Sequence, residues 1–218
     1  IKKLKSELKK SELVAVSKYV PVEDVEMAYQ CGQLDFGENR VVDLHEKAAY
    51  FRSKEYKSVR WHFIGHLQTN KVRELLKVPN LWAIHSIDSL RLTEELLKRE
   101  SDFKGPELKL FFQVNTSHEL EKTGLESIDE LHRAIELVLS KKGTKFKVHG
   151  LMTMGAIRTD NFEVSALKSF RELKIIRDQE MQKFGLSELK LSMGMSQDYK
   201  LALAEGADYI RVGSLIFK

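Results

Sequence analysis

The stretch Leu13-Val14-Ala15-Val16-Ser17-Lys18 is a short apolar run that ends abruptly on a lysine. Its first four residues are apolar without alternation and rich in β-formers, which is typical of a strand buried on both faces in a parallel sheet. Ligands of parallel α/β folds bind at the carboxyl ends of the strands. Lys18 is therefore either a functional amine at such an end or a lysine that reaches for solvent, and the run alone favours neither interpretation.

Strand and helix patterns alternate along the rest of the chain. Strands are predicted over residues 13–18, 34–39, 61–65, 81–88, 108–115, 147–154, 189–193 and 208–212. Helix signals lie between them: Ser89 suits an amino-terminal cap, Ser127 to Glu130 has the form of a capping box, and Gly185 suits a helix end. The sequence predicts eight strands that alternate with helices.

One (β/α)₈ TIM barrel over residues 1–218, with an opening helix at about residues 2–11, accounts best for this alternation. No linker rich in Gly, Ser or Pro divides the chain into domains. A doubly wound open sheet is the alternative fold, and it is weakened because no Gly-x-Gly-x-x-Gly follows the first strand.

Composition excludes several classes of protein. The net charge of +4 is spread over helix-like stretches that mix both signs, as in residues 92–100, so we expect no nucleic-acid partner. No apolar run is long enough to cross a bilayer, so we expect no membrane association. The single cysteine, Cys31, allows no intramolecular disulfide and suits a cytoplasmic protein; we interpret it as a packing residue.

Polar residues gather just past the predicted strands, where a barrel would bring them to one rim. They are Lys18, Glu38, Asn39, His66, Ser86, Asn115, residues 152–154, Met195, Ser196, Arg211, Gly213 and Ser214. His62, His66 and His85 lie near two of these strands, but their spacing fits hydrogen bonding or packing better than a metal site.

The loops after the seventh and eighth strands carry a phosphate-site pattern. Barrels often bind phosphate there, where backbone N–H groups and a short helix converge on an anion. Ser196 precedes a predicted helix, Gly213 allows close backbone approach, and Ser214 adds a hydroxyl. An ordinary helix cap at Ser196 and a plain turn at Gly213 explain the spacing equally well.

A phosphate site beside a lysine suggests a phosphorylated aldehyde or ketone that is held as a Schiff base. The free amine is the reactive form of lysine. Burial of Lys18 among apolar strands and the nearby charge of Arg211 are both expected to favour that form. An aldolase acting on a phosphorylated sugar would use the same pair of features.

Several motifs in a fixed order resemble those of the pyridoxal phosphate homeostasis protein family. They are Ala15-Val16-Ser17-Lys18, Phe36-Gly37-Glu38-Asn39, Trp61-His62-Phe63-Ile64-Gly65-His66-Leu67-Gln68-Thr69-Asn70-Lys71, His149-Gly150-Leu151-Met152, Leu191-Ser192-Met193-Gly194-Met195-Ser196 and Arg211-Val212-Gly213-Ser214. The resemblance covers nearly the whole chain. It implies a barrel like the amino-terminal domain of alanine racemase.

The resemblance also implies pyridoxal 5'-phosphate (PLP) as the cofactor, bound to Lys18 as a Schiff base. The other implied contacts are Ser196, Gly213 and Ser214 at the phosphate, Arg211 at the pyridine nitrogen, Asn39 at the polar edge of the ring, and Met195 and Met152 in packing. Two positions depart from the family pattern, Val42 where glutamine is usual and His66 where proline or glycine is common. They concern the ring-edge contacts and leave the assignment of Lys18 intact.

Arg211 argues for holding PLP rather than for strong catalysis. A guanidinium stays protonated and so disfavours protonation of the pyridine nitrogen, which makes the ring a weaker electron sink. Racemisation needs a second acid or base, which alanine racemase takes from a carboxyl-terminal domain. This chain ends soon after the eighth strand, so we expect neither that domain nor its dimer, and we expect a monomer.

The sequence therefore predicts a PLP-binding protein of vitamin B6 homeostasis that buffers the cofactor or delivers it to apo PLP-dependent enzymes. We expect it not to be an enzyme. The alternative is a PLP-dependent amino-acid racemase of low activity.

Overall fold

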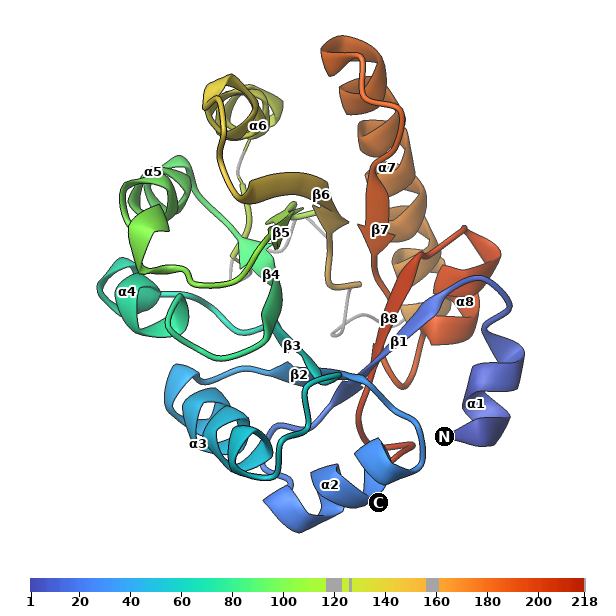
Figure 1. Ribbon diagram of the computed structural model, residues 1–218. Helices are drawn as coiled ribbons and strands as arrows, with labels where there is room; N and C mark the ends of the chain where they lie inside the picture. Colours follow the sequence, from blue (N-terminus) through green and yellow to red (C-terminus); the bar gives the residue numbers. More distant parts are fainter. Residues whose placement is uncertain (117–122, 126, 156–160, 218) are drawn as a thin grey trace.

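Eight parallel strands close into a barrel that helices surround (Figure 1). The computed structural model describes residues 1–116, 123–125, 127–155 and 161–217. The strands are β1 (Glu12–Val16), β2 (Asp35–Glu38), β3 (Arg60–Phe63), β4 (Leu81–Ile87), β5 (Leu108–Gln113), β6 (Phe146–Met152), β7 (Lys190–Ser192) and β8 (Tyr209–Val212). Each strand pairs with the next along the chain, and β8 pairs with β1. The predicted (β/α)₈ barrel is confirmed.

The helices follow the strands on the outside of the barrel (Figure 1). They are α1 (Lys2–Glu7), α2 (Val22–Gln30), α3 (Val41–Ser53), α4 (Val72–Leu75), α5 (Leu90–Lys98), α6 (Ile128–Ser140), α7 (Phe162–Phe184) and α8 (Tyr199–Ala204), with 3₁₀ turns η1 (Thr69–Lys71) and η2 (Glu100–Asp102). No helix of the described residues is long and apolar enough to cross a membrane.

Local chemistry sets several helix ends as the sequence predicts. Ser89 Oγ accepts a hydrogen bond from the backbone N–H of Leu92 at the start of α5, and Ser127 Oγ accepts from that of Glu130 in α6. Gly185 ends α7 at φ 62°, a left-handed conformation that a residue without Cβ adopts freely. The Glu130 carboxylate also accepts from the N–H of Leu90 and so joins α6 to α5.

Strand alternation produces two apolar layers. Side chains that point outward pack against the helices, while Val14, Ala83, Phe111, Met152 and Tyr209 form a separate buried cluster within the barrel. The barrel interior is therefore filled with side chains, as it is in other barrels of eight strands.

Three local predictions are wrong. α1 ends at Glu7 rather than near residue 11, and β1 ends at Val16 rather than at Lys18. Cys31 is exposed, so it is not a packing residue. It follows the last residue of α2, where the chain turns back toward β2.

Candidate functional site

Lys18 lies in a turn, two residues beyond the end of β1. The backbone N–H of Val20 donates to the carbonyl oxygen of Ser17 at 3.0 Å, and Tyr19 adopts the left-handed conformation at φ 63°. The side chains of Lys18 and Tyr19 are both exposed. The prediction that the amine is buried among apolar strands is therefore wrong. The amine stands at the open end of the barrel, where solvent can reach it.

A buried ion pair beneath this turn holds the backbone that leads to Lys18. Lys47 Nζ of α3 lies 2.6 Å from Glu38 Oε1 and donates to the carbonyl oxygen of Ser17 at 2.7 Å. Ser17 Oγ donates to the same carboxylate oxygen at 2.7 Å. Burial raises the pKa of Glu38, although the hydrogen bonds from Lys47 and Ser17 oppose the rise. Glu38 thus supports the turn from below, instead of lining the rim as the sequence suggests.

The first of two matching turns follows β7. The carbonyl oxygen of Met195 accepts hydrogen bonds from the backbone N–H of Asp198 at 3.1 Å and of Tyr199 at 2.8 Å. In the part of the chain that the structure describes, no group accepts a hydrogen bond from the N–H of Ser196 or Gln197. The turn therefore offers two amides, and Ser196 adds a half-buried hydroxyl beside them.

The second turn follows β8 and repeats this arrangement. The carbonyl oxygen of Gly213 accepts from the N–H of Ile216 at 2.9 Å and of Phe217 at 3.1 Å. Among the described residues, none accepts from the N–H of Ser214 or Leu215. This turn again offers two amides and one serine hydroxyl, and neutral donors of this kind are suited to an anion.

Close backbone contacts bring the two turns and Lys18 together. A Cβ on Gly213 would lie 2.8 Å from the carbonyl oxygen of Val16, so glycine lets the exit of β8 approach β1. The N–H of Arg211 donates at 2.9 Å to the carbonyl oxygen of Gly194, which has φ 93°. Since β7, β8 and β1 are neighbours, both turns leave the barrel beside Lys18.

Arg211 is a buried cation inside the same end of the barrel. Its Nη1 donates to Ser192 Oγ at 2.6 Å, and its Nη2 donates to the carbonyl oxygen of Thr153 at 2.8 Å. Burial lowers the pKa of Arg211 to about 10, although the charge of Asp198 acts to raise it. The guanidinium is therefore still protonated at neutral pH and can only donate hydrogen bonds.

Asn39 follows β2 directly, and its side-chain oxygen lacks a hydrogen-bond donor among the described residues. Asn39 Oδ1 is buried, and none of the described residues donates a hydrogen bond to it. A buried acceptor without a donor is costly, so this oxygen is a candidate to receive a ligand hydroxyl.

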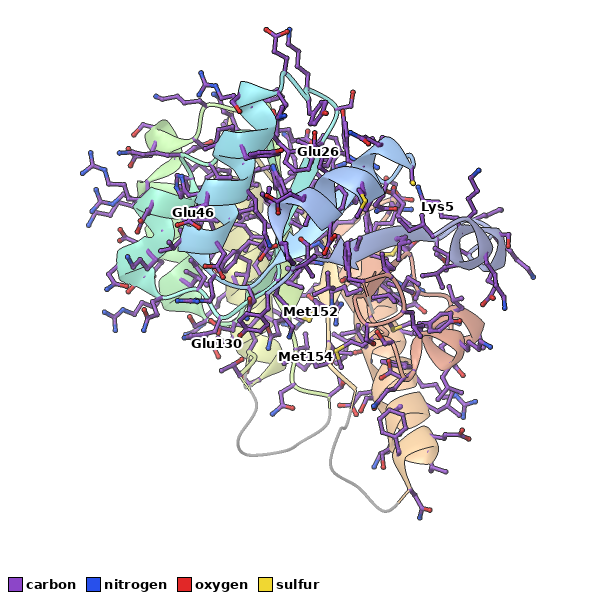
Figure 2. The ribbon with its side chains drawn as sticks, turned by 90° about the horizontal axis from the view of Figure 1, so that it is seen from below. Lys5, Glu26, Glu46, Glu130, Met152 and Met154 are labelled. Atoms are coloured by element: carbon purple, nitrogen blue, oxygen red, sulfur yellow. The ribbon has the colours of Figure 1, made fainter. Side chains whose placement is uncertain are left out.

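The two predicted packing methionines lie near the same end. Met152 is buried at the end of β6, and Met195 is half-buried in the first turn. Figure 2 shows Met154 near the edge of the molecule where Glu130, at the amino end of α6, also lies, with Met152 deeper inside. Because helices start where strands end, this edge is the carboxyl-terminal face of the barrel.

His62 and His85 are buried and hydrogen-bonded to each other. Their partners Asp35 and Ser192 are functional candidates that the sequence did not reveal. The only available signal is the presence of polar residues within otherwise apolar strands. His66 is exposed, and its Nδ1 lies 2.8 Å from Asp88 Oδ2. No group of three or more potential ligands for a metal ion occurs among the described residues.

The barrel is similar to the solved structures of PipY and of alanine racemase. The chain matches the structure of PipY from Synechococcus elongatus without PLP, with a TM-score of 0.88, 32% identity, and coverage of 100% of this chain and 97% of that chain. The structure of PipY with PLP bound gives a TM-score of 0.85. Alanine racemase from Corynebacterium glutamicum shares the fold, with a TM-score of 0.71 and 13% identity over 98% of this chain and 57% of that chain.

Sequence relatives then give the family. The pyridoxal phosphate homeostasis protein of Helicobacter pylori is 39% identical over 95% of this chain and 87% of its own length. The human protein of the same name is 37% identical over 94% of this chain and 75% of its own length. No family model matches the chain. The chain belongs to the family of pyridoxal phosphate homeostasis proteins.

Proposed function

We propose that this protein binds PLP at the carboxyl ends of the barrel strands, holds it through Lys18, and buffers or delivers it in vitamin B6 homeostasis. One observation carries the proposal: two turns with free amides, a buried guanidinium and an exposed lysine leave three neighbouring strands together. The PLP that is present in the PipY structure and the name of the sequence relatives support the same cofactor.

The residues of the site fit the chemistry of PLP. The amides of Ser196, Gln197, Ser214 and Leu215 and the two serine hydroxyls suit the phosphate, with Gly213 allowing the second turn to approach. Asn39 Oδ1 would accept the ring hydroxyl, and Arg211 would donate to the pyridine nitrogen. Met152 and Met195 would pack nearby.

Bound PLP supplies an aldehyde that condenses with a primary amine and a ring that withdraws electrons from the attached carbon. The nitrogen of Lys18 would form a Schiff base with the aldehyde carbon, and the aldehyde oxygen would leave as water. The protonated guanidinium of Arg211 can donate a hydrogen bond but cannot accept a proton, so it would leave the ring nitrogen of bound PLP unprotonated. This arrangement favours holding PLP over strong carbanion chemistry.

The exposure of Lys18 supports delivery. An amine at the open end of the barrel is reachable by a partner, and a buried one is not. We propose apo PLP-dependent enzymes as these partners. A cytoplasmic location, suggested by the lone free cysteine, and a monomeric state belong to the same proposal.

Borohydride reduction of the PLP-loaded protein tests the attachment. We expect the visible absorbance band to disappear and the mass of reduced PLP to be found on the peptide that contains Lys18. Lys18→Ala should lose this label, while Lys3→Ala, which removes another exposed lysine, should keep it. Full binding with an unchanged spectrum in Lys18→Ala would refute the attachment.

Incubation of the loaded protein with D- and L-amino acids tests the holding role against the alternative of a low-activity racemase. We expect no change in optical rotation that depends on Lys18. Measurable turnover would contradict the holding role and favour the racemase. An aldolase would instead lack the visible band.

A further inference from the structure

A continuous row of four hydrogen bonds crosses the inside of the barrel. Arg211 of β8 bonds to Ser192 of β7 at 2.6 Å, and Ser192 bonds to Nδ1 of His85 in β4 at 2.8 Å. Nε2 of His85 lies 2.9 Å from Nδ1 of His62 in β3, and Nε2 of His62 lies 2.9 Å from Asp35 Oδ1 in β2. The row joins the proposed cofactor end of the barrel to the opposite end.

The chemistry of its two ends gives this row a direction. Arg211 can only donate, and an ionised Asp35 can only accept. With one proton on each imidazole, one arrangement satisfies all four bonds: each ring carries its proton on Nε2 and accepts on Nδ1. Ser192 then accepts from Arg211 and donates to His85.

Burial and packing keep the members of the row in place. His62, His85 and Ser192 are fully buried, and Asp35 and Arg211 are nearly so. The ring of His85 stacks on Phe111 with centroids 4.2 Å apart.

The ionisation states agree with this direction. Burial lowers the pKa of His85 well below its usual range, and the charge of Arg211 adds to the effect. Burial acts to raise the pKa of Asp35, but the hydrogen bonds from His62 and Arg60 and the charge of Arg60 oppose the rise, and the pKa is lowered. His85 is therefore neutral and Asp35 ionised at neutral pH.

We propose that Ser192, His85, His62 and Asp35 are positioning residues that hold the Arg211 guanidinium in one orientation through a one-directional row of hydrogen bonds. The row reaches from the far end of the barrel to the one cation that would contact the pyridine nitrogen. Only that last contact rests on the proposed function. The direction of the row is a property of the protein alone.

Nitrogen-15 NMR of the imidazole rings in the wild-type protein tests the direction without any ligand. We expect His62 and His85 both to appear as neutral rings with the proton on Nε2. A proton on Nδ1 of His85, or a doubly protonated His62, would overturn the proposal.

Asp35→Asn tests whether the carboxylate sets the direction. An amide can donate as well as accept, so we expect a second population with the proton on Nδ1 of His62 and His85. Glu12→Gln is the matched control, because Glu12 also bonds to Arg60 yet lies outside the row. Unchanged rings in Asp35→Asn, or an equal change in Glu12→Gln, would overturn the assignment.

Ser192→Ala tests the link to the cofactor. It removes one of the two bonds that orient Arg211, so we expect the dissociation constant of PLP to rise about tenfold and the visible band to shift. Ser169→Ala, which removes another buried serine hydroxyl, should change neither.

Equal PLP binding in Ser192→Ala and the wild type would refute the positioning role. A wild-type protein that bound no PLP would instead refute the proposed function, while the ring protons measured by NMR would still decide the direction of the row.

Discussion

The charged side chains at the two ends of the barrel have different kinds of partner. At the amino-terminal end, Arg60 pairs with Asp35 and, at 3.3 Å, with Glu12, while Lys190 lies 2.5 Å from Glu188 and 3.3 Å from Asp208. At the carboxyl-terminal end, Arg211 bonds to neutral oxygens, and the described residues leave four backbone amides without acceptors. The cations named at the first end are paired with carboxylates, whereas the described residues at the other end leave donors without acceptors.

This difference separates stability from function along the barrel axis, as in other barrels of this type. Cavity size alone would mislead, because a cavity of about 920 Å³ lies at the amino-terminal end, between the segments that lead into β3, β4 and β5. The backbone amides without acceptors point instead to the carboxyl-terminal end. Substitutions at the two ends should therefore have different consequences.

Arg60→Met should have the largest effect, which is a loss of stability. The substitution leaves the buried carboxylate of Asp35 without its cation, so we expect the free energy of unfolding to drop by about 2 to 3 kcal/mol. Urea denaturation followed by circular dichroism measures the drop. Lys190→Met, at a more solvated pair of the same end, should lose less than about 1 kcal/mol. Equal losses would contradict the importance of the buried pair.

Gly213→Ala should lower both the stability and the affinity for PLP, because Gly213 lies where β8 meets β1. The added Cβ would lie 2.8 Å from the carbonyl oxygen of Val16, so the second turn must move. We expect a loss of about 1 to 2 kcal/mol in stability and weaker PLP binding in a fluorescence titration.

Gly32→Ala is the control, since a Cβ there meets nothing within 4 Å and only the backbone strain at φ 84° remains. It should leave PLP binding unchanged. A Gly213→Ala protein with wild-type affinity would show that the approach of β8 to β1 does not shape the site.

Ser196→Ala and Ser214→Ala should each weaken PLP binding while leaving stability nearly unchanged. Each removes one hydroxyl donor to the phosphate, which corresponds to about 1.4 kcal/mol or a tenfold higher dissociation constant. Neither hydroxyl is fully buried, so unfolding should change by less than about 0.5 kcal/mol. Ser53→Ala on α3 should alter neither quantity. A stability loss without weaker binding would reverse the proposed division between the ends.

The sequence predicts those features whose causes are local. Ser89, Ser127 and Gly185 end their helices through contacts within a few residues, so their patterns are sufficient. The apolar run before Lys18 likewise identifies β1. The burial of Lys18 was mispredicted because the length of a strand depends on its neighbours. The pairing of β1 with β2 and β8 stops at Val16 and Ala15, respectively.

The interior row of hydrogen bonds lay beyond prediction for a different reason. Asp35 contacts His62, and Ser192 contacts His85, only because the barrel closes and alternation turns these side chains inward together. Nothing near Ser192 in the sequence indicates a histidine partner on β4. The candidate residues at strand ends could be found because a parallel barrel gathers all such ends on one face.

Substitution of His149 should have the smallest effect, and the quantity that it changes is the pH dependence of stability. Its ring contacts Tyr209 and Phe111 within the barrel, and burial lowers its pKa to about 4, with the charges of Lys109 and Lys190 adding to the effect. Above about pH 6.5 the ring is neutral in both the folded and the unfolded chain, so it makes no difference to stability. Between about pH 6.5 and 4 the His149 ring binds a proton in the unfolded chain but not in the folded chain, so stability falls as the pH falls. His149→Gln should remove about 1 kcal/mol of the decrease between pH 7.5 and 4.5, a value reduced for the partial exposure of the ring. Urea denaturation of both proteins at the two pH values measures this difference, and an equal decrease in both would mean that the ring of His149 stays accessible to protons in the fold.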